Sequence, residues 1–399
     1  MPQRIAWFAL IIAVAFFSAL ANSEGVAPSQ SEIVALLSAR EYAELDRRLT
    51  SVQEDYKHRV IDDVNLREAF RGLYFTTSSL AVNFDEWVQR FPKSYVAYLA
   101  RGIYYKKIGQ ERRGPQAATD TSVEQFRGME QAFERASADL QTSLLLDEKP
   151  LLSLLHQINI YKLLGEGAMG RELLDRSVQI DKGNYVVRYA YMDALQSPWG
   201  GNVAQMKAFL HECREARLSA AQLRTLEALV AEDEAWTQRA EGNNVAAARA
   251  YRREATLSPQ GSCIPCGPIH KAADALFDEK KYSEAIKLYS KVLLRDPHSI
   301  PALNRRGFGE LQLEQWKAAF RDFRQTAELG DAYGQDMLGR MFLSGSAVPQ
   351  DRDKAIEWFK KAADQGYEPA QEMLYMVSDR RNKVCPGARG LETRISPNC

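Results

Sequence analysis

The chain has 399 residues, with 52 Lys and Arg, 52 Asp and Glu, and 45% hydrophobic residues. At roughly 100–200 residues per domain this length allows about two to four domains, and the composition is ordinary for a globular protein, which excludes wholesale disorder. The zero formal charge argues against a nucleic-acid binder, because affinity for phosphate depends on a surplus of Lys and Arg.

The first segment has the order of a secretory signal peptide. Arg4 precedes an uncharged run from Ile5 to Leu20, and small residues lead up to Ala21. This order predicts cleavage after Ala21. An uncleaved membrane anchor is the alternative, although the run of 16 residues is shorter than the ~20 that a span usually needs. We expect a signal peptide over 1–21, a linker over 22–30, and an exported protein, most simply in a bacterial periplasm, without a membrane span.

Residues 31–235 carry the periodicity of helices. Apolar residues recur at spacings of three and four in otherwise charged sequence. Examples are Tyr42, Leu45, Leu49, Val52 and Tyr56. No sustained two-residue alternation appears, so we predict helices and no strands. Pro92 ends one helix and Ser94 can cap the next. Further helices are predicted over 151–164, 171–180 and 204–216.

Three motifs make this region distinctive. They are Arg101-Gly102, Arg113-Gly114 and the turn Pro198-Trp199-Gly200-Gly201. Together with the segments around them, these motifs make residues 31–235 resemble a bacterial domain of unknown function in which the same motifs recur. The resemblance implies a tetratricopeptide-like helical fold and no established activity, so a role for Trp199 or for the two arginines rests on the pattern alone.

Residues 101–113 concentrate positive charge. Arg101, Lys106, Lys107, Arg112 and Arg113 are opposed only by Glu111, and Tyr98, Tyr104 and Tyr105 lie between them. One interpretation is a solvated helix face that leads into a loop. The functional interpretation is a groove for an acidic or C-terminal carboxylate-bearing segment, which arginine recognises well. The candidate partner-binding residues are Arg101, Tyr105, Lys106, Arg112, Arg113 and Trp199.

Several reactive patterns are absent or misplaced. Residues 165–170 have the glycine spacing of a dinucleotide-binding loop, but they follow a predicted helix where that loop needs a strand, so we predict a turn. Neither a metalloprotease helix motif nor a serine-hydrolase elbow is present. Cys213 lies in an amphipathic stretch and is predicted to be a buried apolar side chain. The sequence therefore predicts no catalytic residue, no metal site and no cofactor.

Residues 236–380 carry an internal repeat. Ala273 recurs as Gly307 and Ala285 as Ala319, both 34 residues later. Such small residues let paired helices approach, while an aromatic residue one turn after the second small residue fills the space against the next unit. The pattern resembles the tetratricopeptide repeat, which implies stacked helical hairpins. Its further members are Tyr282, Tyr289 and Pro297, then Trp316 and Phe323, and, at an offset of 38 residues before Ala285, Ala247 with Tyr251 and Pro259.

The next unit is the most specific stretch of the chain. AYGQDMLGRMFLSGSAVPQDRDKAIEWFKKAADQGY closely resembles the Sel-type variant of the tetratricopeptide repeat through the residues listed at the end of this paragraph. Its period is 36, since Gly330 recurs as Gly366. A fourth start runs out near Arg380, with Tyr375 where the motif has Gly339, and we interpret it as a terminal cap. The motif residues are Leu338, Gly339, Gly345, Asp351, Lys354, Ala355, Trp358, Ala362, Ala363 and Gly366.

Four cysteines lie outside the predicted helices. Cys263 and Cys266 stand two residues apart in a loop between repeat units. In an exported protein such a pair can form a disulfide, act as a thiol–disulfide couple or bind a metal. We favour disulfides. A redox-active cysteine pair usually stands at the N-terminus of a helix that follows a strand, whereas this pair lies between helical repeats. Cys385 and Cys399 lie in the irregular tail 381–399. We expect them to form a disulfide with each other, which would close the tail; the alternative is that each pairs with one cysteine of the loop.

These patterns predict an all-α fold, an α-solenoid of tetratricopeptide- and Sel-like helical hairpins. Such a stack presents a long concave surface that can bind peptide segments. We therefore expect a non-enzymatic interaction scaffold with a protein or peptide partner, no nucleic acid and no cofactor. The alternative is a thiol–disulfide oxidoreductase or isomerase that uses Cys263 and Cys266.

Overall fold

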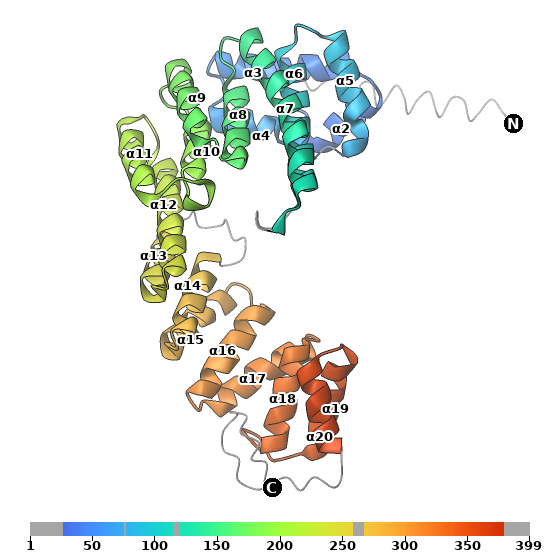
Figure 1. Cartoon of the computed structure of the whole chain (residues 1–399), viewed down its shortest axis with the longest axis vertical. Coiled ribbons are helices and arrows are strands. Elements are labelled where there is room, and N and C mark those ends of the chain that lie inside the picture. Colours follow the sequence, from blue (N-terminus) through green and yellow to red (C-terminus); the bar gives the residue numbers. More distant parts are fainter. Residues whose placement is uncertain (1–26, 76, 115–119, 258–266, 379–399) are drawn as a thin grey trace, which may run out of the picture. The chain divides into compact units, whose positions relative to one another are not determined.

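The computed structural model describes residues 27–75, 77–114, 120–257 and 267–378 (Figure 1). Within these ranges the chain forms nineteen α-helices, three short 3-10 helices and no strand, which confirms the predicted all-α class. The predicted signal peptide lies outside the described residues. None of the helices in the described ranges combines the length and the apolar character that crossing a membrane requires.

The chain divides into two compact units, residues 1–226 and 227–399. The division falls inside one helix, α12 (Ala220–Ala240), whereas the sequence pattern places the boundary at 235/236.

The first unit consists of helical hairpins. Its elements are α2 (Gln30–Ser38), α3 (Tyr42–Lys57), α4 (Asp63–Ala69), η1 (Arg71–Phe75), η2 (Ser78–Leu80), α5 (Ala81–Arg90), α6 (Tyr95–Arg113), α7 (Val123–Leu146), α8 (Leu151–Leu164), α9 (Gly167–Ile180), α10 (Val186–Ala194), η4 (Ser197–Trp199), α11 (Val203–Glu215) and the first part of α12.

Local signals fix several of these helix ends. α5 ends before Pro92, and the Ser94 hydroxyl accepts a hydrogen bond from the Ala97 amide at 3.1 Å, so the predicted stop and cap are confirmed. Only residues 165 and 166 form the turn between α8 and α9, where Gly165 ends α8 in the left-handed conformation with φ 76°. The predicted turn over 165–170 is therefore too long, because residues 167–170 belong to α9. α9 begins at Gly167, earlier than the predicted 171.

Glycines set the close packing of α6 on α7. A Cβ atom at Gly102 would lie 2.8 Å from Leu140 Cγ, and one at Gly109 would lie 2.4 Å from Phe133 Cε1. Both distances are shorter than carbon atoms tolerate, so the two helices approach as closely as they do because these two positions carry no side chain.

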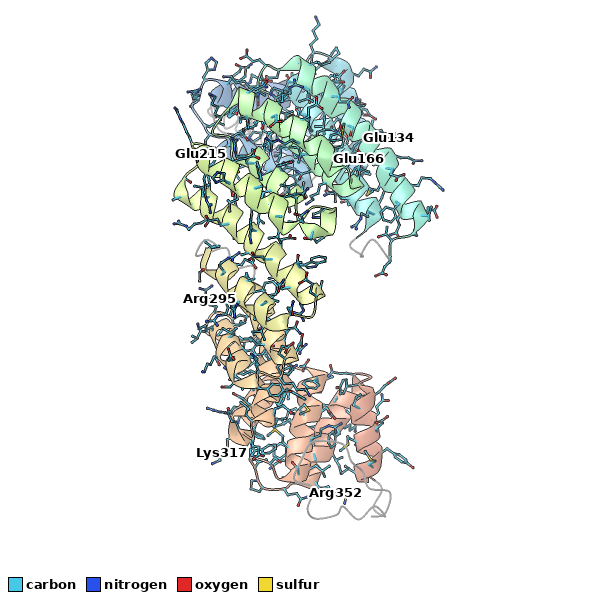
Figure 2. The ribbon with its side chains drawn as sticks, turned by 60° about the vertical axis from the view of Figure 1, so that its left-hand side comes forward. Glu134, Glu166, Glu215, Arg295, Lys317 and Arg352 are labelled. Atoms are coloured by element: carbon cyan, nitrogen blue, oxygen red, sulfur yellow. The ribbon has the colours of Figure 1, made fainter. Side chains whose placement is uncertain are left out.

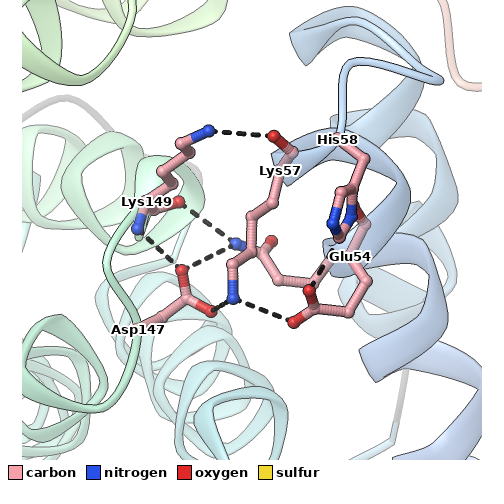
Figure 3. A network of polar contacts seen from close by, with 6 residues as sticks. Glu54, Lys57, His58, Asp147 and Lys149 are labelled. Atoms are coloured by element: carbon pink, nitrogen blue, oxygen red, sulfur yellow. Dashed lines mark hydrogen bonds and ion pairs between the residues drawn. The ribbon is translucent and has the colours of Figure 1, made fainter.

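A polar network fastens α3 to the segment between α7 and α8 (Figure 3). The Gln53 amide donates to Asp147 Oδ1 and to the Lys149 carbonyl, both at 3.1 Å. Lys57 donates to Glu54 at 2.9 Å and to Asp147 at 3.5 Å, and Lys149 Nζ donates to the Lys57 carbonyl at 2.9 Å. The network joins residues about ninety positions apart and fixes the first hairpins against the centre of the unit.

The second unit is the repeat array. It begins with the second part of α12 and continues with α13 (Asn244–Leu257), α14 (Gly267–Asp278), α15 (Tyr282–Leu293), α16 (Ile300–Gln312), α17 (Trp316–Glu328), α18 (Ala332–Ser344), α19 (Arg352–Asp364) and α20 (Glu368–Ser378).

The buried residues of this unit are those that the repeat predicts. Ala273, Ala285 and Tyr289 are completely buried. The position of Gly307 faces the Phe323 ring so closely that a Cβ atom would lie 3.0 Å from it. Most charged side chains lie on the outside of the helices, as Figure 2 shows for Lys317 on α17, whereas Glu310 and Asp322 are buried. The predicted stacking of helical hairpins is confirmed.

Candidate functional site

The second unit contains a groove of about 470 Å³ that three helices line. These helices, α14, α16 and α18, are the first helices of three successive hairpins. Each hairpin supplies only one of these first helices, so the groove forms only where consecutive repeats stack. Its lining residues are His270, Asp274, Phe277, Pro301, Asn304, Arg305, Phe308 and Tyr333.

The repeat register explains why these side chains share one surface. Ala273 and Gly307 are buried, and they occupy equivalent positions of α14 and α16. Three residues before each stands His270 or Asn304, and one residue after each stands Asp274 or Phe308. Side chains four residues apart lie on one helix face, so α14 and α16 each contribute such a pair to the groove, and α18 contributes Tyr333.

Aromatic side chains form the apolar wall of the groove. The Phe277 and Phe308 rings lie 5.7 Å apart between centroids. The Arg305 guanidinium lies 4.7 Å from the centroid of the Phe277 ring, a distance typical of a cation–π contact. Phe277, Phe308 and Tyr333 are only partly buried, so a further apolar side chain that contacts them would remove apolar surface from water.

Polar side chains of the groove hold one another in place. Asp274 accepts a hydrogen bond from the Tyr289 hydroxyl at 2.6 Å, and His270 Nε2 lies 3.7 Å from the same carboxylate. Burial raises the pKa of Tyr289 above its ordinary value, so this hydroxyl stays a donor. Asn304 donates to Asp331 at 2.8 Å, and its own carbonyl oxygen is buried without a hydrogen-bond donor among the described residues.

The predicted basic stretch of the first unit does not form one exposed patch. Arg101 makes a two-pronged ion pair with Asp139, at 2.8 Å and 2.7 Å, and a third contact with Asp85 at 3.0 Å. Its guanidinium therefore links α6 to α7. Lys106 is 6% exposed and, five residues further along, lies on a helix face about 140° away from that of Arg101.

The other candidates near Arg101 have separate surroundings. The Tyr105 hydroxyl donates to Asp85 at 3.4 Å, and the Arg135 guanidinium lies 5.5 Å from the Tyr105 ring centroid. Arg112 is exposed and donates to the Gly128 carbonyl at 3.2 Å. Arg113 is half-buried, and its main-chain carbonyl accepts from Gln125. Of the predicted arginines, Arg112 is thus the one that reaches solvent most fully.

Lys106 belongs to a buried chain of polar groups. Its Nζ lies 3.0 Å from His156 Nδ1, and His156 Nε2 lies 2.8 Å from the Tyr74 hydroxyl. Within the described part of the chain no carboxylate bonds to Lys106. Burial lowers the pKa of Lys106 from 10.5 to about 7, and repulsion from Arg67 and Lys162 adds to this effect. Burial and the nearby cations also lower the pKa of His156, so the imidazole is neutral.

We expect Lys106→Met to flatten the pH dependence of the free energy of unfolding between about pH 7 and 10.5. In that window the unfolded chain holds a proton on Lys106 that the folded chain lacks. The free energy of unfolding therefore rises with pH, by up to about 1.4 kcal/mol per pH unit from this group. The same contribution is lost again as the pH falls towards 7. Urea unfolding of wild type and variant at pH 7, 8, 9 and 10 measures the difference. Lys107→Met, on the same helix, should keep the wild-type slope; equal slopes for all three proteins would contradict the assignment.

Trp199 lies against Lys162 of α8. Lys162 Nζ is 4.7 Å from the centroid of the Trp199 ring and donates to Asp193 at 2.5 Å. Lys162 is also one of the cations that disfavour a charged Lys106. Trp199 thus lies against Lys162, and none of the contacts described for Trp199 or Lys106 reaches Arg101.

The cysteine predictions can be followed only in part. Cys263, Cys266, Cys385 and Cys399 lie outside the described residues. Cys213 is a free, completely buried thiol, as predicted. Burial raises its pKa to about 11, so the thiol stays protonated and unreactive at neutral pH. In the described ranges, no three His, Cys, Asp or Glu side chains come together in a way that could hold a metal ion.

Sequence reasoning did not find the groove residues of the second unit. The repeat period carried a usable signal, because it fixes which positions of each first helix face the second helix. The positions three before and one after the small residue lie about 60° and 100° around the helix from it, on the flank beside the packed face. For Lys106 the signal was its spacing of four and three residues from Gly102 and Gly109, which places it on the face of α6 that is packed against other helices.

Residues 332–367 match the Sel1 repeat family, which confirms the predicted Sel-type repeat. The match does not extend to residues 31–235, whose resemblance to a domain of unknown function stays a prediction. No curated protein matches the sequence.

Three solved repeat structures are similar to the chain. A protective antigen of uropathogenic Escherichia coli with an SLR fold is 17% identical, covers 86% of this chain and 71% of its own, and has a TM-score of 0.32. A Sel1 repeat protein from Oxalobacter formigenes is 15% identical, covers 90% and 92%, and has a TM-score of 0.33. Yeast Tom70 is 11% identical, covers 88% and 89%, and has a TM-score of 0.32.

Proposed function

We propose that this tetratricopeptide- and Sel1-like repeat protein is an exported, non-enzymatic scaffold that binds peptide segments of envelope or secreted proteins. The observation that carries the proposal is the groove across α14, α16 and α18, where aromatic side chains of successive repeats remain partly exposed. Export is inferred from the signal-peptide pattern of residues 1–21, and the periplasm is the compartment in which such partners occur.

The groove suits an extended or helical segment better than a small molecule. Three successive first helices line it, and its polar groups are spread over all three. An extended chain advances about 3.3 Å per residue, and packed helices lie about 8–10 Å apart. A segment of a few residues therefore passes from one repeat to the next and contacts both.

Crosslinking followed by mass spectrometry in the native compartment tests the proposal. We expect crosslinks that join exported proteins to α14, α16 or α18, and we expect Phe308→Ala to reduce their yield at least fivefold, because it removes the central aromatic wall of the groove. Phe320→Ala is the matched control, since this ring lies on α17, a second helix, and packs on Phe342.

Two results would overturn the proposal. One is a set of crosslinked partners that is unchanged in the Phe308→Ala protein while that protein remains folded. The other is a chain that stays in the cytoplasm of its own host, which would remove the envelope and secreted proteins as partners.

A further inference from the structure

Arg305 is the one cation among the residues that line the groove. It lies on α16 between the contributions of α14 and α18, and its side chain is 45% exposed. Its guanidinium has no hydrogen-bond acceptor among the described residues. The contacts it does make are ion-pair contacts at longer range, with Nε 4.0 Å from Asp274 and Nη1 3.6 Å from Asp278.

The two aspartates near Arg305 have closer partners. Asp274 accepts the Tyr289 hydroxyl at 2.6 Å, and Asp278 accepts Arg239 Nη2 at 2.7 Å. Neither carboxylate therefore depends on Arg305 for its hydrogen bonds. The guanidinium is the group whose donors remain open, and planar guanidinium donors bind carboxylate oxygens in pairs.

The Phe277 ring holds this guanidinium in position. The carbon at the centre of the guanidinium lies 4.7 Å from the ring centroid, so the side chain loses less conformational freedom when it binds an anion than a solvated arginine would. The neighbouring Asn304 is likewise held in its orientation, by its hydrogen bond to Asp331.

Apolar and acidic recognition are adjacent in this groove. Phe277 and Phe308 supply the apolar wall, and Arg305 stands beside both rings. An occupant that uses both features carries a large apolar side chain within one or two residues of a carboxylate.

We infer that Arg305 sets the specificity of the groove for peptide segments in which a large apolar residue neighbours an acidic residue. This inference rests on the proposed function and narrows it to a class of partner. A segment with a basic residue at the same place would meet Arg305 with like charge and is disfavoured.

The first experiment selects a random nonapeptide library on the purified mature protein. We expect enrichment of peptides with Leu, Phe or Trp within two residues of Asp or Glu. Enrichment of apolar peptides without acidic residues would overturn the role of Arg305 and leave peptide binding intact. Absence of any enriched peptide would overturn the proposed function itself.

The second experiment is a double-mutant cycle on the best peptide. Replacing its acidic residue by the matching amide should weaken binding to wild type roughly tenfold, the effect of one hydrogen bond to a charged group. The same replacement should change binding to Arg305→Gln less than twofold, and Arg305→Lys should fall between. Arg324→Gln, an exposed arginine on α17 that pairs with Glu328, should behave as wild type. An equal loss in wild type and Arg305→Gln would overturn the inference.

Discussion

Gly201→Ala is expected to destabilise the first unit by about 3 kcal/mol or more, the upper range for inserting an atom into a packed site. A Cβ atom at this position would lie 2.0 Å from the Leu195 carbonyl oxygen and 2.4 Å from the carbonyl carbon. Both atoms belong to the backbone at the end of α10, so no flexible side chain can move away. The turn after Trp199 has to open, or α10 has to shorten.

The neighbouring glycine provides a matched control. Gly200 has φ 89°, and a Cβ atom there would meet nothing within 4 Å. Its requirement is conformational, and asparagine tolerates the left-handed region better than other residues with side chains. Gly200→Asn should therefore cost less than about 1 kcal/mol.

Thermal unfolding followed by circular dichroism separates the two glycines. For a unit of this size, 3 kcal/mol corresponds to a fall of roughly 6–12 °C in melting temperature. If Gly201→Ala melts with wild type, the tight approach of the turn to Leu195 is wrong.

Phe359→Ala should cost about 3–5 kcal/mol and act on the last repeats only. Phe359 is completely buried, and its ring lies so close to Gly339 that a Cβ atom there would be 2.8 Å from it. The truncation leaves a cavity between α18 and α19, where the ring now packs on Gly339. Because each repeat contacts only its neighbours, the loss should not spread evenly through the array.

Hydrogen exchange measures where protection is lost. We expect amides of α18, α19 and α20 to exchange faster in Phe359→Ala, while those of α14 and α15 keep their rates. Trp358→Ala is the control, because Trp358 is partly exposed and its ring makes a cation–π contact with Lys361 Nζ, 3.9 Å from the ring centroid. We expect this substitution to lower the free energy of unfolding by about 1 kcal/mol. Uniform loss of protection along the whole unit would contradict a local role.

Most of the fold could be predicted because small and large side chains recur at fixed positions of the repeat. Ala273, Ala285 and Gly307 are small where helices touch, and Tyr289 and Phe323 are large one turn later. Helix ends followed the same local rules. The start of α9 was predicted late, because Gly167 and its neighbours offer little hydrophobic periodicity.

The candidate site could not be predicted in the same way. Charge counting over residues 101–113 did not reveal that Asp139, 38 residues after Arg101, neutralises that arginine across α6 and α7. It likewise treated Lys106 as a surface cation, although the helical period places it with Gly102 on the packed face.

The sequence by itself determined the helices, their pairing into hairpins and the Sel1 repeat, because hydrophobic period and small residues act over a few turns of one helix. Only the tertiary structure decided which side chains meet across repeats. The groove joins Phe277, Arg305 and Tyr333 from three helices, and the open donors of Arg305 depend on Asp274 and Asp278 having found other partners. Such satisfaction of hydrogen bonds is a property of neighbours in space, which a linear pattern does not fix.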